Sequence, residues 1–154
     1  MKLRDYITEG RAYLLERPDS RDAVLKRLSE QAAAAETSID PEQLYEALLE
    51  REAKGATAMP EGVALPHALL EGVEQNMVFV ASVRGGVDFK AQRGGPVDLI
   101  FMLVGPKDAP WEHIRLLARI ARICHTPGAL DRLRESGSAA VLYERLVAED
   151  KRHV

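Results

Sequence analysis

The sequence predicts an α/β fold of the α+β-like kind, a mixed β-sheet sandwiched by α-helices. Two apolar stretches, 77–83 and 97–104, have the character of strands. Segments with apolar residues at helical spacing come before, between and after the strands, which requires helices on both faces of the sheet. The pair Gly85-Gly86 predicts a hairpin-like turn, so the sheet should be at least partly antiparallel.

The bulk properties of the chain indicate one globular domain over residues 1–154, with a core from about 11 to 149. The net charge of −3 gives no basic excess that would indicate a nucleic-acid partner. The single cysteine, Cys124, excludes an internal disulfide and a multi-cysteine metal site. The N-terminus is too polar for a secretory signal, and no segment reaches the roughly 18 apolar residues that span a bilayer. We therefore expect a cytoplasmic protein without direct membrane insertion.

The first half of the chain predicts a short strand and two helices. The apolar run within 11–16 suits the strand. The turn ending at Ser20 can cap a helix over 21–35, where apolar residues recur at helical spacing. Asp40 is a cap and Pro41 a first helical residue for the next helix, which extends to about residue 53.

The second half alternates between strands and helices. Residues 63–65 read as a short buried strand that ends at Pro66, and 68–74 as a connector. The apolar run at 97–104 predicts a central strand covered on both faces. Residues 87–95 predict an extended piece and a glycine-rich turn, and Gly105-Pro106 ends the second strong strand. A helix with Asp108 as its N-cap then extends to residue 124, and two shorter helices follow at 129–135 and 138–149.

Two histidines lie where elements of this sheet end. His67 follows Pro66 directly, at the end of the short strand, and could be a surface residue or a reactive one. His113 lies in the first turns of the helix after the second strong strand, on its apolar face. By itself His113 would be a core histidine with a satisfied hydrogen bond. Because both flank the same sheet, acid–base chemistry, metal binding and nucleophilic catalysis are all open.

The other motifs narrow this choice. Glu61 and Glu112 are not spaced as metal ligands near the histidines, although a metal-binding hydrolase remains an alternative. The chain contains no nucleophile elbow, no Walker A loop and no Gly-x-Gly-x-x-Gly motif. These absences favour histidine itself as the nucleophile and predict no cofactor.

Residues 56–67 resemble the signature of the enzyme IIA domains of the bacterial phosphoenolpyruvate-dependent phosphotransferase system (PTS), of the fructose, mannitol and nitrogen-regulatory class (EIIA type 2). That signature typically reads Ser-Thr-Gly-Ile-Gly-x-Gly-hydrophobic-Ala-hydrophobic-Pro-His. The segments 87–89 and 96–103 resemble the strand pair of the family, and 113–121 its second-histidine helix. The pair Arg51-Glu52 is also typical, and the resemblance extends from about Tyr13 to Val147.

The resemblance implies a mixed sheet sandwiched by helices, as in the phosphotransferase/anion-transport-protein fold, and a sugar-transport phosphotransferase role. His67 would accept a phosphoryl group from the phosphocarrier protein HPr or a paralogue and pass it to a IIB component. His113 would stabilise the phosphohistidine, and Arg51 would neutralise the phosphate through its bidentate guanidinium. Thr57 would donate its hydroxyl to the phosphate.

The sequence also departs from the family signature. Ala58 and Pro60 replace glycines, and Glu61 adds a carboxylate that we expect to repel phosphate. The retained histidines and Arg51 favour a phosphoryl carrier, whereas the altered loop favours the alternative, a regulatory protein-binding module of the same fold. Trp111, beside His113, is compatible with either a core or a docking position.

Overall fold

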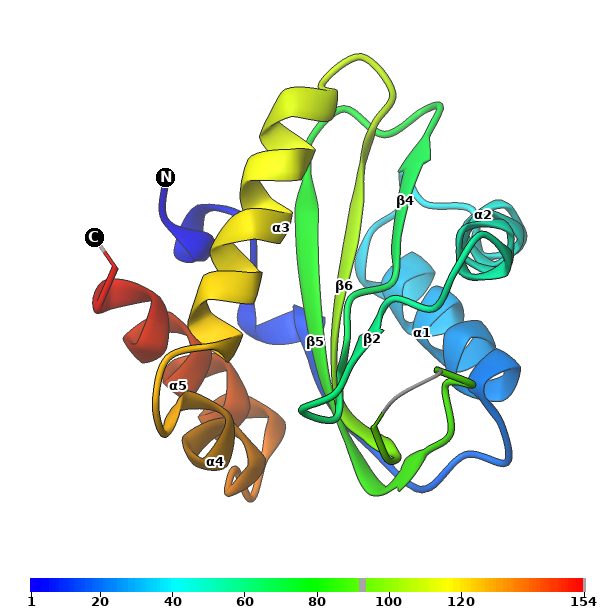
Figure 1. The fold of residues 1–154 in the computed structure, drawn as a ribbon. Coiled ribbons are helices and arrows are strands. Elements are labelled where there is room, and N and C mark those ends of the chain that lie inside the picture. Colours follow the sequence, from blue (N-terminus) through cyan, green and yellow to red (C-terminus); the bar gives the residue numbers. More distant parts are fainter. Residues whose placement is uncertain (92–93, 154) are drawn as a thin grey trace.

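A computed structural model of the chain describes residues 1–91 and 94–153. One mixed sheet has α1 and α2 on one face and α3, α4 and α5 on the other, which confirms the predicted fold class (Figure 1). The helices are α1 (Arg21–Ala35), α2 (Pro41–Ala53), α3 (Pro110–Cys124), α4 (Ala129–Arg134) and α5 (Ala139–Lys151). The strands are β1 (Ala12–Leu15), β2 (Ala58–Met59), β3 (Val63–Ala64), β4 (His67–Leu70), β5 (Met77–Val87) and β6 (Val97–Pro106). Two 3₁₀ helices, η1 (Leu3–Asp5) and η2 (Glu9–Arg11), precede β1.

Strand β6 organises the sheet, whose order is β1-β5-β6-β3-β2 with β4 also paired to β6. The β5–β6 and β2–β3 pairs are antiparallel, while β1 pairs with β5 in parallel. Strands β3 and β4 both run parallel to β6, one after the other, with Val63 opposite Leu99 and His67 opposite Leu103. The position of His67 is therefore set by pairing with the central strand.

The residues of β6 alternate between two hydrophobic cores. Ile100, Met102 and Val104 pack on the side of α1 and α2, and Leu99, Phe101 and Leu103 on the side of α3 to α5. All are fully buried, because helices cover both faces of the sheet. The prediction of a central strand covered on both faces is confirmed.

The predicted turn at Gly85-Gly86 is wrong, because β5 continues through both glycines to Val87. Their φ angles are +82° and +73°, and the pairing with β6 shifts register between Ser82 and Val87. Glycine adopts positive φ readily, so the pair forms a bulge within the strand instead of reversing the chain. Of the extended piece predicted over 87–95, residues 92–93 lie outside the described residues.

Three boundaries near the histidines also differ from the predictions. Residues 68–70, predicted as part of a connector, continue from His67 as β4, because an open edge of β6 is available to pair with them. The sequence predicts that β6 stops at Val104, but the strand includes Gly105 and ends at Pro106. The N-cap of α3 is Ala109, not Asp108, and no side chain caps this helix.

The N-terminus is joined to α3 and α5 through one buried carboxylate. Asp150 is 2% exposed and accepts the Leu3 backbone N–H at 2.8 Å and the Arg119 Nε–H at 2.5 Å. The neighbouring Arg132–Glu149 pair links α4 to α5. Among the described helices, none has the length and apolar character needed to cross a membrane.

We predict that Asp150→Ala lowers the free energy of unfolding by about 3 kcal/mol, because it leaves a buried guanidinium and an amide without their acceptor. Urea denaturation followed by circular dichroism measures this change. Asp108→Ala is the matched control, since Asp108 is exposed and caps nothing, and should change stability by less than about 0.5 kcal/mol. Equal effects of the two substitutions would contradict the anchoring role of Asp150.

Candidate functional site

His67 is the first residue of β4, and its ring is fixed by its own segment. The Nδ1–H group donates to the Leu65 carbonyl oxygen at 2.8 Å. Because a carbonyl only accepts, this contact assigns the proton of the neutral ring to Nδ1. Nε2 is then left with a free lone pair, which is the form that a histidine nucleophile requires.

Arg51, in the last turn of α2, contacts that free nitrogen. Its Nε–H donates to His67 Nε2 at 3.2 Å, and its Nη1–H donates to the Gly55 carbonyl at 2.9 Å. The hydrogen bond to Gly55 holds the Arg51 side chain in place, so its guanidinium is already oriented towards His67 Nε2. The structure thus brings together the predicted pair His67 and Arg51.

His113 enters the site from α3. Its ring centroid lies 5.4 Å from that of His67, and the side chain is 4% exposed. Nδ1 lies 3.3 Å from Asn76 Oδ1, and the buried Nε2 has no hydrogen-bond partner among the described residues. The predicted juxtaposition of the two histidines is therefore present, and His113 is not a fully satisfied core residue.

Residues that the sequence analysis did not assign to the site position His113. Asn76 Nδ2–H donates to Glu112 Oε1 at 2.7 Å, and the Tyr6 hydroxyl donates to Glu112 Oε2 at 3.2 Å. A Cβ on Gly105 would lie 1.9 Å from Asn76 Oδ1, so only glycine leaves room here. No spacing signal reveals this cluster, because Asn76 and His113 are far apart in the chain.

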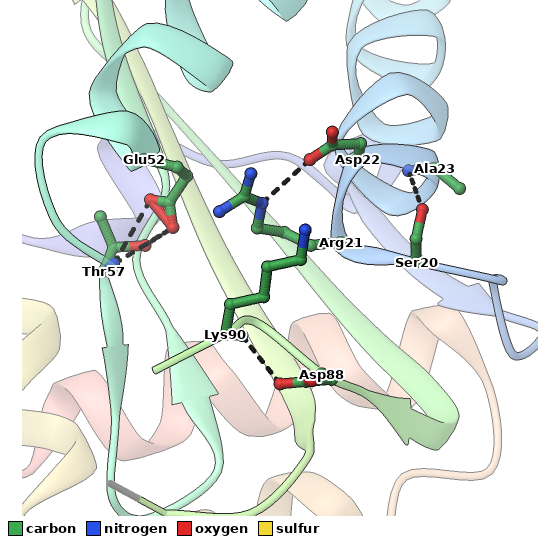
Figure 2. A network of polar contacts seen from close by, with 8 residues as sticks. All are labelled: Ser20, Arg21, Asp22, Ala23, Glu52, Thr57, Asp88 and Lys90. Carbon is green, nitrogen blue, oxygen red and sulfur yellow. Dashed lines mark hydrogen bonds and ion pairs between the residues drawn. The ribbon is translucent and has the colours of Figure 1, made fainter. Parts of the chain in front are cut away.

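Thr57 directly precedes β2 in the chain, and its hydroxyl is not directed at His67. It donates to Glu52 Oε1 at 2.9 Å, and its backbone N–H contacts the same carboxylate (Figure 2). The Thr57 carbonyl accepts the Leu65 N–H at 3.4 Å, and Leu65 in turn orients His67. The contacts that Thr57 makes here support the backbone of the site, and its predicted donation to phosphate stays a prediction.

Of the altered loop residues, Ala58 lies in β2, and Pro60 and Glu61 lie in the turn between β2 and β3. The Gly62 N–H donates to the Met59 carbonyl at 3.1 Å, which closes a turn with Pro60 and Glu61 at its centre. Proline suits such a turn because its φ is preset and its missing N–H is not needed there. The Glu61 carboxylate lies 3.4 Å from His125 Nε2, at the end of α3 opposite His113. The expectation that Glu61 repels phosphate at His67 is therefore wrong.

The site keeps both imidazoles neutral. Burial of the ring and the adjacent Arg51 charge lower the pKa of His67, against the raising effects of the Leu65 carbonyl and Glu52. Burial, with a smaller effect of His67, lowers the pKa of His113 to about 4. Neutral rings at pH 7 keep lone pairs available for bond formation or proton uptake.

The His67 edge opens into a cleft of about 510 Å³ between α2 and β4. Its lining includes Arg51, His67, Lys54 and Lys107, with Glu46 and Glu50 farther along α2. The basic groups suit an anionic reactant near the ring.

Other chemistries find less support in the described part of the chain. Residues 1–91 and 94–153 contain no group of three or more histidine, cysteine, aspartate or glutamate side chains that could hold a metal ion. Cys124 is buried, and burial raises the pKa of its thiol to about 12, so it is a poor nucleophile.

Comparisons with known proteins agree with the class that this fold and histidine pair define. Residues 6–148 match the family model described as "Phosphoenolpyruvate-dependent sugar phosphotransferase system, EIIA 2". The chain belongs to this family, as the resemblance predicted.

Its relatives include nitrogen regulatory proteins. One from Pseudomonas aeruginosa is 33% identical over 147 residues, an alignment that covers 96% of this chain and 96% of the relative. One from Bradyrhizobium diazoefficiens is 36% identical over 128 residues and covers 83% of each chain. The crystal structure of the nitrogen regulatory protein IIA-Ntr from Neisseria meningitidis superimposes with a TM-score of 0.81 at 26% identity, over 93% of this chain and 96% of that one.

We predict that stability decreases as the pH falls from 7 to 5, in part because of His113. The unfolded chain binds a proton at the ordinary histidine pKa, whereas the folded chain binds it only near pH 4. Between these values the unfolded state holds more protons, so lowering the pH favours unfolding, by about 2 kcal/mol over this interval for His113.

Urea denaturation at pH 7 and pH 5 for the wild type and His113→Gln measures this contribution. The variant should lose about 2 kcal/mol less than the wild type over the interval. An identical loss in both proteins would show that His113 is not held neutral by the fold.

Proposed function

We propose that this protein is a phosphoryl carrier that accepts a phosphoryl group on Nε2 of His67. The donor would be an HPr-like phosphocarrier protein of the phosphotransferase system. The acceptor would be a IIB component or a regulatory target, and the exchange would take place in the cytoplasm. The observation that carries the proposal is the state of the His67 ring: Nδ1–H donates to the Leu65 carbonyl oxygen, and the unprotonated Nε2 accepts a hydrogen bond from Arg51.

The chemistry needs little beyond this arrangement. The N–P bond of the donor phosphohistidine breaks as the bond to His67 Nε2 forms, so catalysis depends on alignment and charge stabilisation. The Arg51 guanidinium, already oriented by Gly55, can turn its N–H groups to phosphate oxygens. His113, 5.4 Å away ring to ring, is the next group within reach of the phosphoryl oxygens.

The relatives favour a regulatory use of the phosphoryl group. Two relatives that cover most of this chain are named nitrogen regulatory proteins. We infer that the phosphorylated and unphosphorylated forms act as signals in nitrogen regulation, and that direct service to a sugar permease is secondary. The alternative of a binding module without phosphotransfer has lost one of its arguments, because Glu61 and Pro60 lie away from His67.

An exposed apolar pair beside the site supports docking of a protein donor. Trp111 is 77% exposed and Ile114 is 53% exposed, both on α3 next to the buried His113. A large exposed tryptophan is a frequent anchor in protein interfaces. Of the core and docking positions that the sequence left open for Trp111, its exposure excludes the core.

We predict that wild-type protein incubated with a phosphorylated HPr-like carrier gains an acid-labile, base-stable phosphohistidine, and that His67→Ala gains none. Arg51→Ala should lower the transfer rate about 100-fold, and Arg51→Lys should recover only part of it, because lysine lacks the bidentate geometry. Radiolabelled transfer in a quenched-flow assay measures these rates.

Arg27→Ala, an exposed residue on α1, is the control and should transfer at the wild-type rate. Label that persists in His67→Ala would refute the site, and an unchanged rate in Arg51→Ala would refute the role of Arg51.

We predict that Trp111→Ala weakens transfer from the carrier protein about tenfold or more and leaves phosphorylation by the small donor phosphoramidate unchanged. The reason is that only a protein donor would contact the tryptophan. Leu14→Ala, an exposed residue of β1, serves as the control. Equal loss with both donors would indicate damage to the site instead of lost docking.

A further inference from the structure

We propose that Asn76, oriented by Glu112, sets the tautomer of His113, so that His113 can bind a phosphoryl group on His67 only by taking up a proton from solvent. The inference rests on the proposed phosphoryl transfer to His67 and adds a positioning residue and a proton to it. The carrier would then bind a proton each time it is phosphorylated and release one each time it passes the phosphoryl group on.

The orientation of Asn76 follows from its contact with Glu112. The Glu112 carboxylate accepts hydrogen bonds only, so the Asn76 group that lies 2.7 Å from it is the NH₂ group. The Tyr6 hydroxyl occupies the other carboxylate oxygen and keeps this side chain in place. Asn76 Oδ1 therefore faces His113, whose Nδ1 lies 3.3 Å away. Because an amide oxygen only accepts, His113 Nδ1 carries the proton and donates to Asn76 Oδ1.

The consequence falls on the opposite ring nitrogen. With the proton on Nδ1, neutral His113 has only a lone pair at Nε2, and this buried atom has no partner among the described residues. His67 is in the same tautomeric state, since its Nδ1–H donates to Leu65. A phosphoryl oxygen arriving between the two rings would meet a lone pair on His113, which repels it, until Nε2 gains a proton.

The protons and bonds balance in one cycle. The donor N–P bond breaks, the bond to His67 Nε2 forms, and the His67 ring, which keeps its Nδ1–H hydrogen-bonded to the Leu65 carbonyl oxygen, takes the positive charge that the donor ring gives up. A proton from water adds to Nε2 of His113, which becomes an imidazolium that donates from Nδ1 to Asn76 and from Nε2 to a phosphoryl oxygen. When the phosphoryl group leaves, this proton returns to water.

The charged groups around His113 explain why the proton comes only with phosphate. His67 on β4 and Arg51 next to it oppose a positive charge, and on β6 the uncharged Gly105 lies against His113 Nδ1. On its own side, Glu112 favours the charge, but one oxygen is taken by Tyr6 and the other by Asn76. The phosphoryl oxygens bring close to two negative charges at pH 7, which outweigh the single positive charge on the phosphorylated His67 ring and reverse this balance.

Nuclear magnetic resonance of ¹⁵N-labelled protein tests the proposal, because two-bond ¹H–¹⁵N correlations distinguish the tautomers and charge states of each imidazole. In the unmodified protein at pH 7 we expect His113 to be neutral with its proton on Nδ1. After phosphorylation by phosphoramidate we expect both of its nitrogens to be protonated, with its pKa moved from about 4 to above 7.

Two variants separate positioning from packing. Glu112→Gln keeps the shape but can either accept from or donate to Asn76, so Asn76 Oδ1 is no longer fixed towards His113 and the Nε2–H tautomer becomes accessible. Asn76→Leu removes the acceptor and should give a mixture of tautomers. Tyr6→Phe is the matched control, since Glu112 Oε1 still accepts from Asn76, and should keep the wild-type tautomer.

Each outcome decides the matter. A proton on Nε2 in the unmodified wild type, or an undisturbed wild-type tautomer in Asn76→Leu, overturns the role of Asn76. A neutral His113 in the phosphorylated protein overturns proton uptake. If neither phosphoramidate nor the carrier protein labels His67, the proposed function fails and proton uptake fails with it, while the tautomer in the unmodified protein still tests Asn76 separately.

Discussion

The pairing of β4 with β6 is the contact on which the site depends. It places His67 opposite Leu103 of β6. Strand β6 is buried on both faces and cannot shift without disturbing both hydrophobic cores. Leu65 and Pro66 separate β4 from β3, so the Leu65 carbonyl lies next to the ring that it orients. A reactive side chain on such a strand is held more rigidly than one on a loop.

The helices complete the site from both faces of the sheet. Helix α2 supplies Arg51 and α3 supplies His113, so the three groups meet only when all three elements pack against β6 and its neighbours. Polar residues without a reactive role secure the geometry: Glu52 holds Thr57, and Glu112 holds Asn76. Each is a carboxylate that accepts more than one hydrogen bond, which makes it an effective fixed point in a partly buried setting.

Much of the fold was predictable because local signals agreed with it. The bounds of α1 and α2, the central character of β6 and the mixed sheet follow from apolar periodicity, Ser20 and Asp40 as caps, and the length of the apolar runs. The failures occurred where local and tertiary preferences conflict. Gly85 and Gly86 have the composition of a turn, yet they form a bulge because β6 continues to pair beyond them at Val87. Residues 68–70 were predicted as part of a connector and lie in β4 because β6 offers a free edge.

The sequence by itself determined the fold class and the family, and it singled out His67, His113 and Arg51 as candidate site residues, because these depend on periodicity and on a local signature around His67. Only the tertiary structure decided the protonation of the two rings, the distance of Glu61 from the site and the contacts of Asn76 with Glu112 and His113. These features depend on contacts between residues far apart in the chain and on burial. Neither can be read from spacing, since both arise only when the helices close over the sheet.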